Sequence, residues 1–399
     1  MGSKVETEML LKSIYPDMIQ WRRYLHRHPE LSFQEKETSR WIAERLQEIG
    51  CEVEIGIGGY GLIARIRGDR PGPVVALRAD IDALPIQDEK TCDYTSSVPG
   101  VMHACGHDAH TASMLGIARY YCSQRENLSG ERRLLFQPAE EVTPGGALGM
   151  IQSGALEGVD VIFGVHLWTP LPYGIVSSKG GAFMAAPDEI SIEIAGQGGH
   201  GGLPHDTVDS IYIGSALVQA MQSIVSRNVN PLEPAVVSIG SFQAGTIGNV
   251  IAERCQLLGT VRTFNEATRD RIRERLETLV SQTAAMHRAT AKLDYRLGYP
   301  PVVNDEEEAR RFFQVAEEQF GKAAVQVSEP IMVGEDFSYY LREKPGCFMF
   351  VGAGNEACGA VYPHHHPKFD VDERAMLISA QLMIAMAEDY ISEHSANTV

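Results

Sequence analysis

The hydrophobic pattern of the first fifty residues predicts two helices. Apolar residues from Leu10 to Trp21 recur near helical spacing, and a second run from Trp41 to Ile49 stops at Gly50. Further along, short β-rich runs at 62–66, 74–78, 134–136 and 161–165 alternate with helical stretches such as 107–122. Strands that alternate with helices are typical of an α/β fold, so we expect a layered domain with a mostly parallel sheet.

A different pattern begins near residue 188. Ile190, Ile192 and Ile194 alternate with more polar residues, as in a half-exposed strand. The elements that follow are a helix at 208–226, strands at 236–242 and 256–264, a helix at 266–287 and a strand at 291–296. This βαββαβ order is typical of a ferredoxin-like unit. We therefore expect residues 188–298 to form a lid domain inserted into a catalytic domain of residues 1–187 and 299–399, with hinges near 186–188 and 298–301.

The composition and charge narrow the classes of partner. With 44% hydrophobic and 22% charged residues, the chain has the composition of a globular protein. Its net charge of −17 argues against binding to nucleic acid or to an anionic membrane surface, and no apolar run is long enough for a membrane helix. The seven cysteines are scattered and the chain opens without a signal segment, which predicts reduced thiols in a cytoplasmic protein.

One of these cysteines lies in an unusual cluster. Residues 102–110 contain Cys105 together with His103, His107, Asp108 and His110, where a loop runs into a predicted helix. A thiolate and a neutral imidazole two residues apart are able to face one cation across Gly106, and a nearby carboxylate such as Asp108 is able to orient the ligating ring. The alternative is a helix start that is capped by Asp108 and carries ordinary surface histidines.

Two adjacent acids follow the strand at 134–136. Glu140 and Glu141 emerge at its carboxyl end, the edge at which open α/β sheets bind ligands. One carboxylate is able to hold a cation while its neighbour accepts a proton from water. His166 likewise lies at the carboxyl end of the next apolar strand, at 161–165. Considered alone, Glu140 and Glu141 have a solvated acidic pair as their alternative interpretation, and His166 has a structural histidine.

A loop before the last helix supplies three more imidazoles, His364, His365 and His366. With Cys105, His107, Glu141 and His166, one of these histidines gives five donors, enough for two metal ions that share a ligand. The sequence contains no Gly-x-Ser-x-Gly motif and no phosphate-binding loop.

Taken together, these segments resemble the amidohydrolase branch of the M20 metallopeptidase family, which includes aminoacylases, hippurate hydrolases and auxin-conjugate hydrolases. The similar motifs occur in the family's order and span almost the whole chain, at 78–85, 105–108, 138–141, 164–166, 198–200 and 334–337. The resemblance implies a zinc-peptidase-like catalytic domain and an inserted lid that also serves in dimerisation.

The resemblance further implies a dinuclear centre for Zn, Mn, Co or Ni. Cys105 resembles the shared ligand, and His107, Glu141, His166 and His365 complete the set. His365 is chosen because the family's ligand lies two residues before a proline like Pro367, while His364 and His366 stay open as alternatives.

The same resemblance assigns roles around the metals. Glu140 resembles the general base, and Asp80, Asp82 and Asp108 are expected to orient the ligands. In the wider family the position of Asp80 carries a ligand histidine, so this chain departs from that pattern.

In the lid, His200 resembles the group that stabilises the oxyanion, whether in its own or in a neighbouring subunit. Asn249 and Arg262 resemble groups that hold the free carboxylate of the substrate, although an ordinary strand arginine is the alternative for Arg262.

These observations predict a metal-dependent enzyme that hydrolyses N-acyl-L-amino acids to a free amino acid and a carboxylic acid. We expect it to form a dimer or tetramer through the lid domain. The rival hypotheses are a carboxypeptidase or dipeptidase acting on short peptides, and a non-catalytic protein that binds acyl amino acids or metal.

Overall fold

Both helices predicted near the N-terminus are present, as α1 (Lys4–Arg27) and α2 (Lys36–Ile49). In α1, the apolar face that includes Leu11, Ile14 and Met18 is buried. At the end of α2, Gly50 adopts a left-handed conformation and its N–H donates to the last turn, so the glycine that marked the helix end in the sequence is its C-cap.

An eight-stranded sheet forms the centre of the first part of the protein. The computed structural model gives the strand order β1-β2-β4-β3-β5-β16-β6-β15. The strands are β1 (Glu52–Ile57), β2 (Gly61–Arg67), β3 (Arg70–Asp80), β4 (Ser129–Gln137), β5 (Val161–Pro172), β6 (Val176–Ser178), β15 (Val325–Val327) and β16 (Gly346–Gly354). The central strands β4, β3, β5 and β16 pair in parallel, which confirms the predicted α/β class with a mostly parallel sheet.

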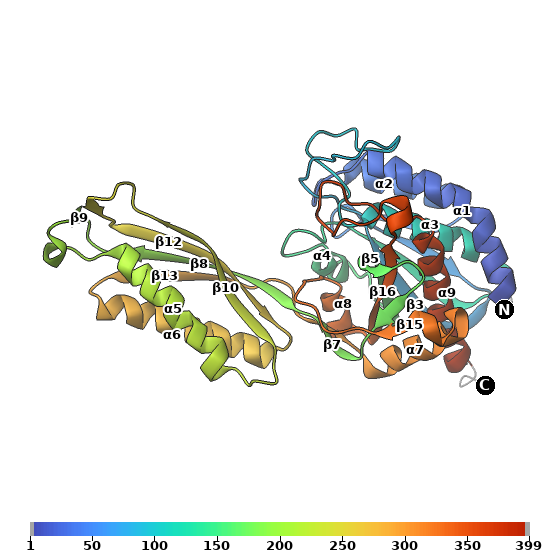
Figure 1. The fold of residues 1–399 in the computed structure, drawn as a ribbon. Coiled ribbons are helices and arrows are strands. Elements are labelled where there is room, and N and C mark those ends of the chain that lie inside the picture. The colour runs from blue at the N-terminus through green and yellow to red at the C-terminus, as the bar shows by residue number, and fades with distance from the viewer. Residues whose placement is uncertain (1–3, 396–399) are drawn as a thin grey trace. The chain divides into compact units, whose positions relative to one another are not determined.

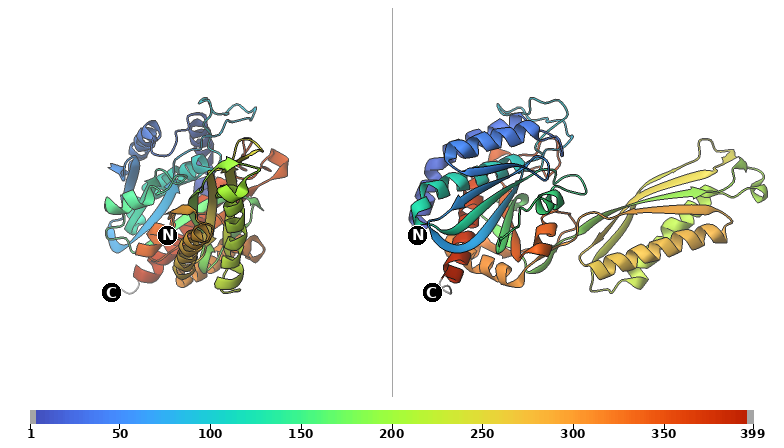
Figure 2. Two further views of the ribbon diagram at one scale, coloured as in Figure 1. Left: turned by 90° about the vertical axis from the view of Figure 1, so that its left-hand side faces the viewer. Right: turned by 180° about the vertical axis from the view of Figure 1, so that it is seen from behind.

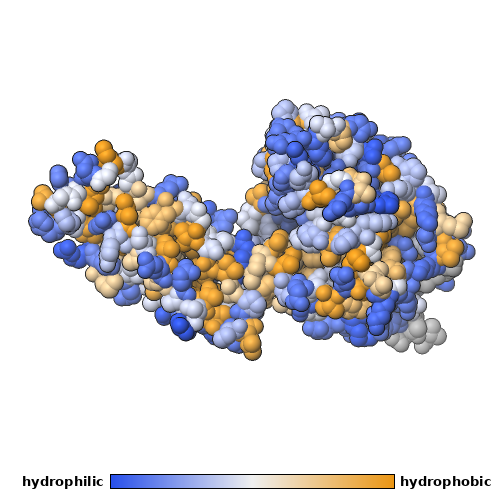
Figure 3. All heavy atoms as spheres, viewed as in Figure 1, coloured by the Kyte–Doolittle hydropathy of each residue, from blue (hydrophilic) through white to orange (hydrophobic). Residues whose placement is uncertain are grey.

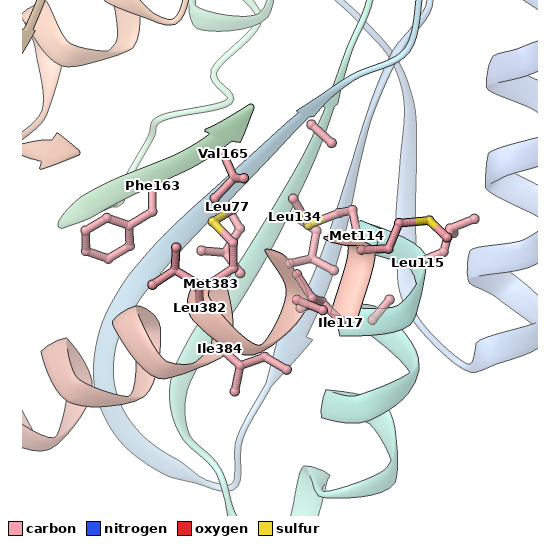
Figure 4. Close-up of a cluster of buried hydrophobic side chains, with 14 of the residues drawn as sticks. Leu77, Met114, Leu115, Ile117, Leu134, Phe163, Val165, Leu382, Met383 and Ile384 are labelled. Atoms are coloured by element: carbon pink, nitrogen blue, oxygen red, sulfur yellow. The ribbon is translucent and has the colours of Figure 1, made fainter. Parts of the chain in front are cut away.

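Two helices close one side of this sheet. In Figure 4, Leu77 of β3 and Leu134 of β4 lie close to Met114 of α3 (His107–Ser123) and Met383 of α9 (Ala375–Ser395). All four side chains are almost fully buried, which contributes hydrophobic stabilisation and fixes the start of α3 against the sheet. The other helices here are α4 (Ala147–Gln152), α7 (Glu306–Phe320) and α8 (Ser338–Glu343), with 3₁₀ turns at Arg125–Asn127, Lys322–Ala324 and Glu356–Cys358.

The second part of the protein has the predicted βαββαβ order. Its elements are β8 (Ala186–Ala195), α5 (Ser210–Asn228), β10 (Ala235–Ala244), β12 (Arg254–Thr263), α6 (Glu266–Met286) and β13 (Thr290–Arg296). The sheet order is β10-β12-β8-β13, and every pairing is antiparallel. Ile190, Ile192 and Ile194 are buried on one face, where α5 and α6 pack against the sheet (Figures 1 and 2). The inserted ferredoxin-like unit is therefore confirmed.

The structure describes residues 4–395, in two compact units. The first unit contains the chain up to Gly181, the segment Val303–Glu329 and the chain from Asp336; the second contains Ala182–Val302 and Pro330–Glu335. The remaining short elements are β7 (Gly181–Met184), β9 (Gly199–His200), β11 (Val250–Ile251), β14 (Val302–Asn304) and a 3₁₀ turn at Pro204–Asp206. The structure gives all seven cysteines as free thiols. Within residues 4–395, no helix is long and apolar enough to cross a membrane.

Candidate metal centre

The carboxyl ends of three parallel strands bring the candidate ligands to one edge of the sheet. Asp80 at the end of β3 is in register with Gln137 at the end of β4, and Glu140 and Glu141 follow in the next loop. His166 lies in β5, two residues beyond the position that pairs with Arg78 of β3. This shared edge explains why residues far apart in the sequence meet.

Cys105 belongs to two groups of possible metal ligands. In the first it lies with His107 and Glu141, and in the second with His166 and His364, each group having its donor atoms within 4.8 Å of one another. Gly106 has a φ of +94°, a conformation that side chains disfavour, and it lets the chain turn from Cys105 directly into α3 at His107. One thiol is therefore positioned for sharing between two cations.

His107 is oriented by Asp82. Its Nδ1 atom lies 3.0 Å from the backbone oxygen of Asp82 and 3.1 Å from its carboxylate, so the ring donates there. Its buried Nε2 atom has no hydrogen-bond partner among the described residues and lies 3.8 Å from Oε1 of Glu141, which is also unpartnered. Burial opposes a charged ring, but the carboxylates of Asp80, Asp82 and Glu141 outweigh it and raise the pKa of His107 to about 10. The site thus presents unsatisfied donors in a strongly negative surrounding, as a cation requires.

His166 presents its other nitrogen to Cys105. Its Nδ1 atom bonds the backbone oxygen of Leu167 at 2.8 Å, which leaves Nε2 facing the sulfur of Cys105 at 3.4 Å. Burial and the neighbouring rings of His110 and His364 lower the pKa of His166, so the ring is neutral and able to ligate a metal.

The thiol of Cys105 depends on a cation for its charge. Burial, together with the carboxylates of Glu141, Glu140 and Asp80, raises the pKa of Cys105 well above that of a free thiol. A metal ligand must be the thiolate, so metal binding at this position releases a proton.

The three histidines of the C-terminal loop have different surroundings. His365 has its Nε2 atom 3.4 Å from Oε2 of Glu141. His364 accepts the backbone N–H of Thr169 at Nε2, and its Nδ1 lies 3.8 Å from the Cys105 sulfur. His366 is stacked on Tyr362. Of the three histidines, only His364 lies in one of the two donor groups around Cys105, and the predicted ligand His365 lies outside them.

The three acids predicted to orient the ligands are not equivalent. Asp82 contacts His107 directly and also accepts the backbone N–H of Glu141. Asp80 bonds His110 at 2.6 Å and Arg78 at 2.7 Å, so both of its oxygens are engaged. Asp108 contacts Arg22 and His26 of α1 instead of a ligand ring, and it therefore holds α3 against α1.

The three residues singled out in the second unit lie at two places. His200 in β9 pairs with Val250 in β11, next to Asn249, and both His200 and Asn249 are exposed. Glu253, which precedes β12, accepts a hydrogen bond from Gly196, so this ribbon lies near the start of β12, whereas Arg262 lies near its far end. Arg262 lies eight positions along β12 from Arg254, or roughly 26 Å at about 3.3 Å per residue. Within this unit, His200 and Arg262 are therefore not brought together.

The sequence interpretation missed several residues that hold the centre in place. His110 donates to Asp80 and accepts the N–H of Leu167. Ser32 donates to Asp82, and Glu35 accepts the N–H of Ala139. No spacing rule connects residues 32 and 35 with this edge; the only signal was an acidic residue just before a helix.

The chain belongs to Peptidase family M20: the profile of the Peptidase family M20/M25/M40 matches residues 76–389. It is 47% identical to the N-acyl-L-amino acid amidohydrolase of Geobacillus stearothermophilus over 76% of this chain and 82% of that protein. It is 39% identical to thermostable carboxypeptidase 2 of Saccharolobus solfataricus, over 93% and 94% of the two chains.

A solved structure of Bacillus subtilis YXEP protein, described as a dinuclear metal binding peptidase of the M20 family, superposes with a TM-score of 0.82. It is 36% identical, and the match covers 96% of this chain and 99% of that one. Together with the donor groups around Cys105, these relationships make the protein a metal-dependent hydrolase of amide bonds with a site for two metal ions.

Proposed function

We propose that the protein hydrolyses N-acyl-L-amino acids to a free amino acid and a carboxylic acid. The observation that carries the proposal is the position of Cys105 in two donor groups, beside a loop that presents two successive carboxylates. The similarity to the Geobacillus amidohydrolase over most of both chains supports this substrate class.

The proposed ligands are Cys105, His107, Glu141, His166 and His365. We choose His365 because its Nε2 atom and Oε2 of Glu141 are 3.4 Å apart. Two ligands of one tetrahedral cation, each about 2.1 Å from it, are separated by about 3.4 Å. His364, which lies in the second donor group with Cys105 and His166, is the alternative ligand through its Nδ1 atom, since its Nε2 atom already accepts the N–H of Thr169.

When bound, two divalent cations lower the pKa of water towards neutrality and polarise the amide carbonyl. Glu140, which is nearly buried next to the ligand Glu141, accepts the proton of the attacking water and delivers it to the leaving amine. Sulfur, nitrogen and oxygen donors together suit Zn, Mn, Co or Ni.

His200 is proposed to stabilise the oxyanion, and Arg262, with Asn249, to hold the substrate carboxylate. The guanidinium of Arg262 is half-buried, and its Nη1 atom lies 3.3 Å from the backbone oxygen of Asp188. Because His200 and Arg262 lie at opposite ends of β12, we propose that they serve different active sites in an oligomer.

We further propose that the second unit forms the contact between subunits. It exposes apolar side chains on α5 and on the strands β10 and β12, among them Ile211, Tyr212, Phe242 and Leu258. Figure 3 shows apolar residues interspersed with polar ones on the face in view. We place the enzyme in the cytoplasm because a thiolate ligand needs a reducing compartment.

A carboxypeptidase activity on short peptides is the second candidate, favoured by the similarity to the Saccharolobus carboxypeptidase. Hydrolysis of a peptide and of an N-acyl amino acid uses the same chemistry, and the two substrates differ in the group on the acyl side of the amide bond.

The test is a hydrolysis screen with N-acyl amino acids and dipeptides side by side, after chelation and reloading with each metal in turn. Activity on N-acyl amino acids is expected to exceed that on dipeptides, and Glu140→Gln should bind both metals and lose turnover. Faster cleavage of dipeptides would replace the proposal with the peptidase, and substantial residual activity of Glu140→Gln would overturn the assignment of the base.

A further inference from the structure

Glu35 is a buried carboxylate whose side chain reaches the loop that carries Glu140. One of its oxygens, Oε1, accepts the backbone N–H of Ala139 at 2.7 Å and that of Phe33 at 3.0 Å. The residue itself has no exposed surface. The segment before α2 is thereby joined to the residue that immediately precedes Glu140.

This arrangement is not helix capping. Glu35 occupies the N-cap position of α2, but its side chain accepts no hydrogen bond from that helix. Its second oxygen, Oε2, is buried without a hydrogen-bond partner among the described residues. Burying a carboxylate in this way is costly, and the pKa of Glu35 is raised to about 7, chiefly by that burial. A side chain buried at such a cost, with a hydrogen bond to Ala139 in the loop that carries Glu140, indicates a role in that loop.

Both amides belong to residues with left-handed backbones. Phe33 has a φ of +62° and Ala139 a φ of +53°, a region that residues with a side chain other than Asn or Asp seldom occupy. Ala139 therefore depends on its contacts to keep a conformation that its own side chain disfavours. The carbonyl of Ala139 accepts the N–H of Gly146 at 3.0 Å, and Glu35 holds the N–H on the other side of the residue.

The same turn also supports the residue on the far side of Glu140. Ser32 donates to Oδ2 of Asp82 at 2.7 Å, and that oxygen accepts the backbone N–H of Glu141 at 3.0 Å. The two neighbours of Glu140 are thus held from residues 32–35, one directly and one through Asp82.

We propose that Glu35 is a positioning residue that fixes Glu140 by holding Ala139 in its left-handed conformation. The proposal rests on the proposed function of Glu140 as the general base. Glu35 itself does not touch the substrate; it sets the direction from which the base carboxylate approaches the water.

Three substitutions separate the reach of the side chain from its charge. Glu35→Gln keeps the acceptor at the same distance without the charge, Glu35→Asp keeps the charge but is one methylene shorter, and Glu35→Ala removes both. We expect Glu35→Asp and Glu35→Ala to lower kcat by about 10- to 100-fold, with KM within about 3-fold and two metals still bound. Glu35→Gln should keep kcat within about 3-fold of the parent. Glu308→Ala, which removes another buried glutamate of the first unit, paired with Arg311, is the control for a purely structural loss.

Two further measurements address the backbone, a rescue of kcat and a hydrogen-exchange measurement that needs no substrate. Glycine adopts a positive φ freely, so Ala139→Gly introduced into Glu35→Ala should recover most of the lost kcat. Hydrogen exchange of the peptide covering residues 138–146 should be faster in Glu35→Ala and Glu35→Asp, but not in Glu35→Gln or Glu308→Ala.

The hydrogen-exchange measurement tests the positioning role of Glu35 separately from the proposed function. A parent enzyme that cleaves no N-acyl amino acid counts against the proposed function, whereas exchange still decides whether Glu35 holds the loop. Parent-like exchange and parent-like kcat in Glu35→Asp would overturn the positioning role, and so would equal losses in Glu35→Gln and Glu35→Asp. If Glu35→Ala does not fold, the Gln and Asp variants give the answer.

Discussion

The Nε2 atom of His107 and the Oε1 atom of Glu141 lie 3.8 Å apart, both buried and both without a hydrogen-bond partner in the described part of the chain. Two buried polar atoms left unsatisfied cost free energy, and they are brought this close by α3 and by the loop after β4. Asp82 holds the opposite side of the imidazole and the backbone of Glu141 at once. The arrangement is a preformed place for a cation.

Replacement of the ligands should change the metal content in a graded way. Glu141→Gln should remove at least one of two bound cations, whereas Cys105→Ser should weaken both because Cys105 lies in both donor groups. Metal content after dialysis, measured by plasma mass spectrometry, checks this, and activity should fall by more than about 100-fold in both variants. Cys358→Ser, a change at an exposed cysteine, serves as the control. Two tightly held metals in Cys105→Ser would contradict a shared thiolate.

The histidine loop allows a direct comparison of three neighbours. His365→Ala should lose a metal, because the Nε2 atom of His365 faces Glu141. His364→Ala should keep both metals but bind them about 10-fold more weakly, since it removes a group beside the Cys105 sulfur. His366→Ala should match the parent. Loss of a metal in His364→Ala with retention in His365→Ala would transfer the ligand role to His364.

Arg262 should act on binding of the carboxylate and leave the chemistry of the amide unchanged. Arg262→Ala is expected to raise KM for N-acyl amino acids by about 10- to 100-fold, which corresponds to the free energy of one hydrogen bond to a charged group. For the same amide without the α-carboxylate, kcat/KM should stay unchanged. Arg273→Ala on the surface of α6 is the matched control. Equal losses on both substrates would show that Arg262 has a structural role.

Much of the fold followed from periodicity alone. The helix predicted at 266–287 is α6 (Glu266–Met286), and the alternation of Ile190, Ile192 and Ile194 identified β8 because one face of that strand is buried. The short helix α4, in contrast, begins at Ala147 within a Gly-rich segment that shows no helical periodicity. The N–H of Ala147 is held by Asp336, a tertiary contact that no local pattern reveals.

The site was predictable where motifs placed several donors together, as in residues 105–107. It was not predictable where a single polar residue acts at long sequence separation. Glu35 contacts Ala139 across 104 positions, and Asp108 turned out to contact α1 because Arg22 and His26 approach it from a segment 82 to 86 residues away. Such contacts depend on how the elements pack, and a single sequence carries no periodic signal for them.

The stability of the metal-free protein should report the charge state of Glu35. Its pKa is raised from 4.5 to about 7, so the folded state binds a proton more tightly than the unfolded state does. The stabilisation from protonated Glu35 is complete below about pH 4.5 and is lost as the pH rises through 7. Glu35→Gln lacks this loss, so its stability relative to the parent should increase between these limits by up to roughly 3 kcal/mol, given 1.36 kcal/mol per pKa unit. Thermal midpoints of the two metal-free proteins across pH 4.5 to 8.5 measure the difference, which should be flat above about pH 8. A difference that does not change with pH would show that Glu35 titrates alike in the folded and unfolded states, and one that falls with pH would reverse the sign of the shift.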